Sequence, residues 1–187
     1  METTDVSIGD TYTISFWLKS TATTSSTYLN FYENSNDTHV LVEHNLNSDH
    51  KYENVRFLDR SPSGATGGKN IYSPFSLHDG TWYQITCISE GNLMCLFVNG
   101  SKVSEALKET TTPLRMASLY VGQNFQNRFF NGSIDDVRIY DRALSTSEVS
   151  ALYYSEAPQF QIIEGGFTWQ EAKTDAESRG GRLAVLD

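Results

Sequence analysis

The sequence predicts an all-β protein built as a two-sheet antiparallel sandwich or jelly roll, and three observations support this. Residues 11–140 of the 187-residue chain read as one short strand after another. Asn, Gly, Ser and Asp residues that favour turns separate the strands, as in SPSGATGGKN and HDG. No helical pattern begins before Ser145. Many short strands with regular turns are typical of sandwiches and jelly rolls.

The first clear strand is TYTISFWLK, residues 11–19. Its large apolar residues alternate with Thr13, Ser15 and Lys19, so one face of the strand is expected to line a core. Comparable patterns predict the strands TYLNFYE, THVLVEH, YENVRFLD, TWYQITCIS, LMCLFVNG and SLYVGQ.

The two cysteines stand on opposite arms of a predicted hairpin, TWYQITCISEGNLMCLFVNG. A cross-strand disulfide is one reading, and two small apolar thiols are the other. Alternation from Leu96 and Val98 places Cys95 on the other face of its strand, which favours the free thiols. Two cysteines without histidines at ligand spacing do not make a zinc site.

The last long strand begins at two adjacent aspartates, in NGSIDDVRIY. Alternation puts Asp135 in register with Val137 and Ile139, and Asp136 in register with Arg138. A carboxylate on the apolar face must be paired, hydrogen-bonded or bound to a metal, because an isolated buried charge is too costly. Asp136 is free to face water or Arg138.

A short helix is predicted after this strand, over residues 145–153. Ser145 and Glu148 form an S-x-x-E capping box, and Val149 and Leu152 give the helix an apolar stripe. The predicted core of the jelly roll consists of Ile14, Phe16, Leu18, Ile85, Leu96, Val98, Val121, Val137 and Ile139.

The character of the chain changes after Tyr154. A linker, residues 155–159, leads into a segment with a second capping box, Thr168 and Glu171, which predicts a helix over residues 168–179. A strand is expected to begin at Leu183, with its partners missing. Residues 160–187 are therefore expected to be an incomplete domain.

Composition narrows the classes of function. The net charge is −9 and the isoelectric point is near 4.8, which argues against a nucleic-acid-binding surface. No run of about 18 apolar residues suggests a transmembrane segment. Met1 is followed by polar residues, so the chain is either cytosolic or a piece of a secreted protein without its signal peptide. The unfinished last segment favours the second reading.

Four blocks, ISFWLK, HDGTWYQIT, LFVNGSKV and FNGSIDDVRIYDRALSTSEVSALY, follow one another along the chain. In these residues the sequence resembles the laminin G-like, concanavalin A-like jelly-roll domains of extracellular proteins. The resemblance covers about residues 3–154 and implies a jelly-roll domain over residues 1–154. The family usually opens with a strand of the form DGxxDYV, of which only TTDVSIG is present here.

The segment 160–187 looks like the first strand, the first helix and the GGRLA turn of a C-type lectin-like domain. This resemblance implies a short α/β fragment of that fold. Ala176 stands where many family members have a cysteine, so the usual long-range disulfide is not expected. The sugar- and calcium-binding residues of that family lie beyond this stretch.

The resemblance to the jelly-roll family implies a structural calcium ion held by an aspartate at the start of the last long strand. The matching residue is Asp135, and Asp5 is a second candidate ligand near the first strand. Calcium accepts six to eight oxygen ligands in flexible geometry. The alternative is that Asp135 accepts backbone N–H groups in a tight turn.

A non-catalytic module that binds a glycan or an extracellular protein is the first functional hypothesis. Sugars are bound by aromatic faces together with amide and carboxylate groups, and Tyr28, Asn30 and Tyr32 are expected on one face of one strand. Tyr52, Tyr72 and Phe125 would extend the platform. The alternative is that the tyrosines only cover an outer sheet surface.

Two other hypotheses stay open. The domain could be a structural spacer without glycan affinity, which fold alone does not distinguish from a binding module. It could also be an accessory domain of a polysaccharide-degrading enzyme, or a divergent enzyme of that kind. Two observations argue against catalysis. The sequence has no E-x-D-x-E run to supply paired carboxylates, and no histidine stands at a spacing tied to a serine or cysteine nucleophile.

Overall fold

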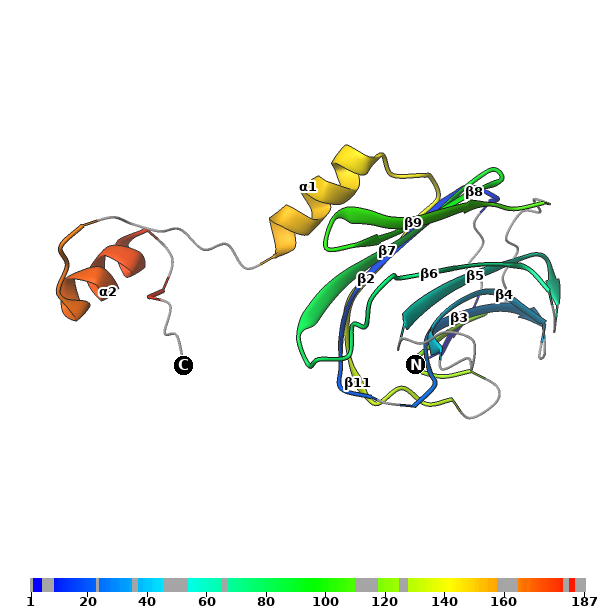
Figure 1. Ribbon diagram of the computed structural model, residues 1–187, viewed down its shortest axis with the longest axis horizontal. Coiled ribbons are helices and arrows are strands. Elements are labelled where there is room, and N and C mark those ends of the chain that lie inside the picture. The colour runs from blue at the N-terminus through cyan, green and yellow to red at the C-terminus, as the bar shows by residue number, and fades with distance from the viewer. Residues whose placement is uncertain are drawn as a thin grey trace. The chain divides into compact units, whose positions relative to one another are not determined.

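The computed structural model describes residues 2–4, 9–22, 24–34, 37–45, 54–64, 67–109, 118–124, 128–157, 165–179 and 182–183. The chain divides into two compact units, residues 1–157 and residues 158–187. The first is an antiparallel β-sandwich with one helix, in which two sheets lie face to face (Figure 1). Its strands confirm the predicted all-β jelly roll.

The six-stranded sheet has the strand order β1-β10-β3-β4-β5-β6. Its strands are β1 (Glu2–Thr4), β10 (Ser118–Val121), β3 (Ser26–Asn34), β4 (Asp37–Asn45), β5 (Asn54–Gly64) and β6 (Lys69–Tyr72). All neighbouring strands are antiparallel.

The five-stranded sheet has the strand order β11-β2-β7-β8-β9. Its strands are β11 (Gly132–Tyr140), β2 (Tyr12–Ser20), β7 (Trp82–Glu90), β8 (Leu93–Val98) and β9 (Ser101–Leu107). These neighbours are also antiparallel.

The main core lies between the two sheets. Alternation along β2 points Ile14, Phe16 and Leu18 inward, and all three side chains are fully buried. Core residues from the opposite sheet include Phe31 and Phe57. The predicted core positions on β2, β7 and β8 are confirmed, because each is at most 5% exposed.

The outer face of the five-stranded sheet carries a second apolar cluster, which α1 (Thr146–Glu156) covers. Val149 of the helix is fully buried there beside Phe97 and Leu144. Ser145 and Glu148 form the predicted capping box, which satisfies N–H groups that the first helical turn leaves without partners. The predicted helix is thus confirmed.

The cysteines lie on the two faces of this sheet. Cys87 belongs to the main core and Cys95 to the cluster beneath α1, and both are free thiols. Burial raises the pKa of both thiols, which keeps them protonated.

Strand β11 contains a β-bulge that reverses the predicted register. Asp135 pairs with Trp17 and Arg138 with Ser15, so that Asp136 and Val137 together oppose the single residue between them. The prediction that Val137 belongs to the core is therefore wrong, since its side chain is 36% exposed. Asp135 is also exposed rather than turned toward the core.

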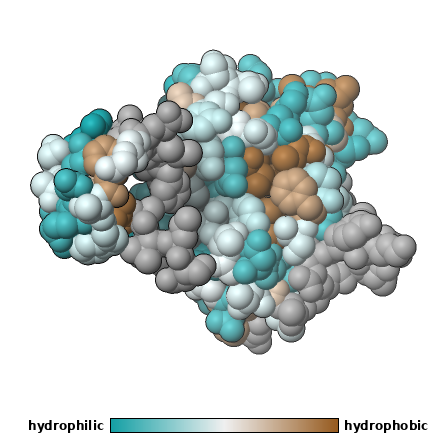
Figure 2. Space-filling view, turned by 60° about the vertical axis from the view of Figure 1, so that its left-hand side comes forward, coloured by the Kyte–Doolittle hydropathy of each residue, from teal (hydrophilic) through white to brown (hydrophobic). Residues whose placement is uncertain are grey.

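Apolar side chains also reach the surface of the first unit. Figure 2 shows an apolar patch among polar residues on one face of the molecule. Large hydrophobic side chains that are at least 36% exposed in the described part of this unit include Phe75, Trp82, Leu107, Phe129, Val137 and Tyr154. They come from different strands, loops and the helix.

The second unit contains α2 (Trp169–Ser178), which confirms the predicted helix there. Thr168 and Glu171 form its capping box, as the sequence predicts. Residues 158–164 and 184–187 lie outside the described residues, so the strands predicted around this helix stay predictions. Among the described helices, none is both long and apolar enough to cross a membrane.

Candidate functional site

The outer face of the six-stranded sheet is the candidate site, and strand register identifies its residues. Side chains that pair directly across antiparallel strands point to the same face of the sheet. The row Val121, Leu29, Val42, Phe57 and Ile71 belongs to the core between the sheets. The next row along the strands therefore points outward.

That outward row runs across five strands as Tyr120, Asn30, Leu41, Leu58 and Asn70. Asn30 is fully buried, and in the described part of the chain its amide oxygen and nitrogen have no hydrogen-bond partner. A buried amide left in this state is unusual, because burying an unpaired polar group costs free energy.

A second outward row contains Thr27, Glu43, Arg56 and Tyr72. The fully buried carboxylate of Glu43 bonds two arginines, one on each oxygen. Arg56 Nη2 lies 2.5 Å from Oε1, and Arg128 Nη1 donates to Oε2 at 3.1 Å. Burial raises the pKa of Glu43, and the two guanidinium groups oppose this rise. The two arginines thus supply the pairing that a buried carboxylate needs.

Arg128 reaches this face from the segment between β10 and β11. Its carbonyl oxygen accepts a hydrogen bond from the Thr27 backbone N–H at 3.1 Å, and its own N–H donates to Asn124 Oδ1 at 3.2 Å. These bonds fix the backbone while the side chain is 39% exposed. The guanidinium is therefore held beside Glu43 and still reaches solvent.

Arg60, in the second half of β5, completes the charged group. Its Nη1 donates to the Gly64 carbonyl at 2.8 Å and its Nε donates to the Gly67 carbonyl at 3.2 Å. Gly68, with φ +89°, passes so close that an added Cβ would lie 2.6 Å from Arg60 Cγ. A glycine is thus required where the backbone crosses Arg60. Burial and then Arg56 lower the pKa of Arg60, whereas Glu43 raises it.

Two tyrosine rings stack on the same face. The ring centroids of Tyr32 and Tyr120 are 4.7 Å apart with an interplanar angle of 18°. Tyr32 is 7% exposed, whereas Tyr120 and Tyr72 are half-buried. The outer face therefore combines aromatic rings, an amide and paired charges, which are the groups that proteins use to bind polar ligands.

Three of the sequence-predicted ligand residues, Asn30, Tyr32 and Tyr72, lie together on this outer face. Tyr28 does not, which corrects the prediction that it shares a face with Asn30. A β-bulge between Thr27 and Leu29 turns Tyr28 into the core.

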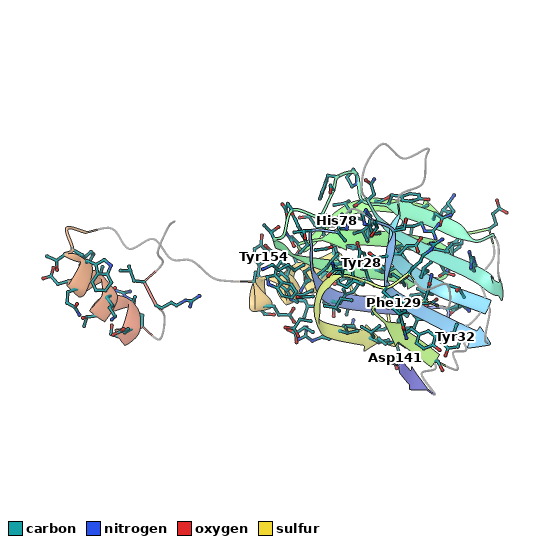
Figure 3. The ribbon with its side chains drawn as sticks, turned by 90° about the horizontal axis from the view of Figure 1, so that it is seen from below. Tyr28, Tyr32, His78, Phe129, Asp141 and Tyr154 are labelled. Carbon is teal, nitrogen blue, oxygen red and sulfur yellow. The ribbon has the colours of Figure 1, made fainter. Side chains whose placement is uncertain are left out.

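Tyr28 is fully buried and has its own partners (Figure 3). Its hydroxyl bonds His78 Nε2 at 2.7 Å, and its ring meets Phe130 edge-on at 5.1 Å. It has no surface to offer a ligand. Tyr52 and Phe125, the remaining predicted ligand residues, lie outside the described residues.

Sequence reasoning missed the arginines and Tyr120. Alternation in HVLVEH and NVRFLD would have placed Glu43 opposite Arg56, provided that the two strands were known to pair. Arg128 gives no such signal, because its position depends on how the segment after β10 folds back on β3.

The calcium ion predicted at Asp135 and Asp5 stays a prediction. No group of three or more His, Cys, Asp or Glu side chains in the described ranges is arranged to hold a metal ion. Asp135 is exposed, and its Oδ1 accepts the Asp136 backbone N–H at 2.8 Å. Asp136 has a left-handed φ of 50°, so this bond caps the bulge. Asp5, the second predicted ligand, lies outside the described residues.

Among the described side chains of β4 and β5, the carboxylates of Glu43 and Asp59 are not paired as glycoside hydrolysis requires. Retaining enzymes need two carboxyl groups about 5 Å apart on the substrate face. Glu43 points to the outer face, whereas Asp59 points inward and accepts a hydrogen bond from Tyr12 Oη at 2.7 Å. The two groups therefore lie on opposite sides of the sheet.

The fold and the sequence together define the class of protein. A laminin G-type family model, described as the concanavalin A-like lectin/glucanases superfamily, matches residues 1–150. The chain belongs to this superfamily. No curated protein sequence matches the chain.

Solved structures share the fold at low sequence identity. A pentraxin resembling serum amyloid P from Limulus polyphemus is 17% identical with a TM-score of 0.59, over 79% of this chain and 71% of that one. Domain 4 of AbnA, an extracellular arabinanase from Geobacillus stearothermophilus in complex with arabinotriose, is 19% identical with a TM-score of 0.60, over 78% and 68%.

A third similar structure is botulinum neurotoxin type C, whose cell entry depends on interaction with two ganglioside molecules. It is 14% identical with a TM-score of 0.64, over 82% of this chain and 39% of that one. At these identities the three structures establish the shared fold alone.

Proposed function

We propose that this protein is a non-catalytic carbohydrate-binding or adhesion module of a larger extracellular protein, and that it binds glycan on the outer face of the six-stranded sheet. The observation that carries the proposal is the group of partly exposed side chains on this face, with Tyr72 across from Arg56, Tyr120 stacked on Tyr32, and Arg128 39% exposed. A glycan hydroxyl both donates and accepts hydrogen bonds, so it can pair with the guanidinium donors and the tyrosine hydroxyls of this face.

The chemistry of this face supports the proposal further. Aromatic rings pack against the C–H faces of sugars, and fixed charged groups bond their hydroxyls. Tyr72 stands directly across from Arg56, so a ring and a guanidinium are neighbours on the sheet. Two proteins of the same fold are described with arabinotriose and with gangliosides, which makes a glycan the first class of ligand to test.

Binding to glycan arrays and titration calorimetry with the full chain test the proposal. Tyr72→Ala and Tyr120→Ala should each weaken binding about tenfold, through loss of a ring face. Tyr154→Ala is the matched control, because this tyrosine is 66% exposed on α1. We expect the control to bind like the wild type.

The alternatives predict different results. A structural spacer would bind no glycan on any array. A divergent polysaccharide-degrading enzyme would release reducing sugar from β-glucans or galactans, whereas an accessory domain of such an enzyme would only bind the polysaccharide. Glycan binding that survives both Tyr72→Ala and Tyr120→Ala would show that the outer face is not the binding site.

A further inference from the structure

The described charged group on the outer face has a positive net charge, whereas the net charge of the whole protein is negative. The chain has 23 acidic and 14 basic residues, a net charge of −9. On the outer face, Arg56, Arg60 and Arg128 all act on the single carboxylate of Glu43. Among the described residues of this group, three positive charges stand against one negative charge, an excess of two positive charges. A local positive field on an acidic protein favours an anionic ligand.

The ion pairs with Glu43 engage only some of the N–H donors of Arg56 and Arg128. A guanidinium has five N–H donors, and the bonds from Arg56 and Arg128 to Glu43 each start from one nitrogen. In the described part of the chain, the buried Nε of Arg56 has no hydrogen-bond partner. Donors therefore stay available on a side chain that is only 15% exposed. A second acceptor close to Glu43 would satisfy them.

The arginines are also positioned in advance. Two backbone carbonyls hold Arg60, and Glu43 holds both Arg56 and Arg128. Less side-chain entropy is then lost when a ligand binds, because the guanidinium groups are already oriented. Arg128, 39% exposed, gives a ligand access from solvent.

We infer that the glycan bound at this face is acidic, and that its carboxylate or sulfate group is bound by Arg128 and Arg56, with Arg60 adding to the positive field. This inference rests on the proposed function, since it names the ligand class of the same face. Guanidinium forks match the paired oxygens of a carboxylate or a sulfate. A neutral glycan would leave the excess charge uncompensated.

The test compares matched neutral and acidic oligosaccharides by titration calorimetry with the full chain. Cellohexaose and lactose serve as neutral ligands, and hexagalacturonate, sialyllactose and a sulfated heparin-derived hexasaccharide serve as acidic ones. We expect at least one acidic ligand to bind tenfold or more tightly than its neutral counterpart. Its affinity should fall as salt rises from 50 to 300 mM, because salt screens exposed charges. The acidic ligands separate carboxylate from sulfate as the recognised group.

Charge variants locate the interaction. Arg128→Gln should weaken binding of the acidic ligand about tenfold or more, through loss of a charge-assisted bond. Arg128→Lys should bind at an intermediate level, because it keeps the charge and loses the fork. Lys102→Gln on β9, in the other sheet, changes net charge equally and should bind like the wild type. The salt dependence of the wild type needs no variant, so the test survives an unfolded mutant.

The outcomes separate this inference from the proposed function. Equal affinity for neutral and acidic ligands, without salt dependence, would overturn the acidic ligand and leave glycan binding intact. An acidic preference that Arg128→Gln and Lys102→Gln reduce equally would overturn the assignment to this face. Absence of binding to every glycan would overturn both proposals.

Discussion

Lys108 Nζ lies 2.8 Å from Asp59 Oδ2 between the two sheets, with the two side chains 3% and 1% exposed. The same nitrogen donates to Ser89 Oγ at 2.7 Å, and the same carboxylate oxygen accepts from Tyr12 Oη at 2.7 Å. These bonds join β5 of one sheet to β2 and β7 of the other. Each buried charge thus depends on the other for compensation.

Removal of either charge should destabilise the protein strongly. We expect Lys108→Ala or Asp59→Ala to lower the free energy of unfolding by about 3–5 kcal/mol, because each removes the oppositely charged partner that lies 2.8 Å from a buried charge. The double variant Lys108→Met with Asp59→Leu should recover most of this loss, since no charge is left buried. Urea unfolding monitored by circular dichroism measures the free energy of unfolding of the two single variants and of the double variant.

An exposed pair provides the comparison for this experiment. Lys102 and Glu105 form an ion pair on β9, with side chains 44% and 54% exposed. Lys102→Ala should leave the free energy of unfolding almost unchanged, because solvent screens an exposed ion pair. Equal losses for Lys102→Ala and Lys108→Ala would contradict the claim that burial makes the inter-sheet pair important.

Phe16 tests the core that the strand pattern predicts. The side chain is fully buried and packs 6.3 Å from the Tyr28 ring, measured between ring centroids. Phe16→Ala should cost about 3–5 kcal/mol of stability, because it removes a large aromatic ring and leaves a cavity. Phe129→Ala is the control, since Phe129 is 62% exposed. An unchanged melting temperature for Phe16→Ala would be inconsistent with this register.

The sequence predicts the core where strands are regular and fails where a bulge adds a residue. Alternation identifies Ile14, Phe16 and Leu18 because β2 is uninterrupted, with continuous pairing to β7. In β11, Ile134 pairs with Leu18 and Ile139 with Ile14, so both face inward across an odd spacing. Strict alternation cannot accommodate that spacing, and the assignments of Asp135 and Val137 fail together.

The same cause limits prediction of the candidate site. One bulge in β3 sends Tyr28 inward, while Asn30 and Tyr32 keep the face that alternation predicts. The charged group around Glu43 depends on contacts between distant segments, since Arg128 is 85 positions away along the chain. Alternation along paired strands predicts which side chains share a face of the sheet. It does not predict the contact between Arg128 and Glu43, because that contact depends on how a distant segment folds back.

His44 should make the protein less stable in acid. Its ring stacks on His78 with centroids 3.8 Å apart, and burial, together with the charge of His78, lowers its pKa from 6.5 to about 4. The unfolded chain therefore binds a proton more readily than the folded one between these values. This contribution to stability is fully present above pH 6.5 and is lost as the pH falls to about 4.

Urea unfolding at pH 7 and at pH 4.5 measures this loss. The wild type should lose about 1–3 kcal/mol more than His44→Gln between the two pH values. The difference between wild type and variant removes the effect of carboxylates that titrate in the same range, including Glu43. An identical pH dependence in the two proteins would show that His44 is not the group responsible.

Glu156 should control how α1 is held on the five-stranded sheet. Its Oε2 accepts from Trp17 Nε1 at 2.8 Å and from Gln84 Nε2 at 2.9 Å, and its Oε1 pairs with Arg138. Glu156→Ala should cost about 2–3 kcal/mol, because it leaves the buried Gln84 amide without this partner. Glu156→Gln should cost less, since one acceptor is kept. Trp17 fluorescence should shift in the Ala variant as the indole N–H loses its partner.

Asp135 is the residue on which the calcium prediction rests, and two substitutions separate a metal ligand from a turn cap. Asp135→Asn keeps the side-chain oxygen that accepts the Asp136 N–H, but removes the negative charge. Asp135→Ala removes both. In the absence of calcium we therefore expect Asp135→Asn to melt like the wild type, and Asp135→Ala to lose about 1 kcal/mol.

Melting curves with and without calcium then decide the role of the charge. An ion that binds the native state alone adds about 2.7 kcal/mol of stability at a hundredfold excess over Kd. A turn cap predicts the same melting temperature for the wild type with calcium, with magnesium or with neither. A metal ligand predicts a rise with calcium and a smaller rise with magnesium, which demands stricter octahedral geometry. Because the Asp135 carboxylate is exposed and already caps the bulge, we expect the first result; a calcium-dependent rise that Asp135→Asn abolishes would establish the second.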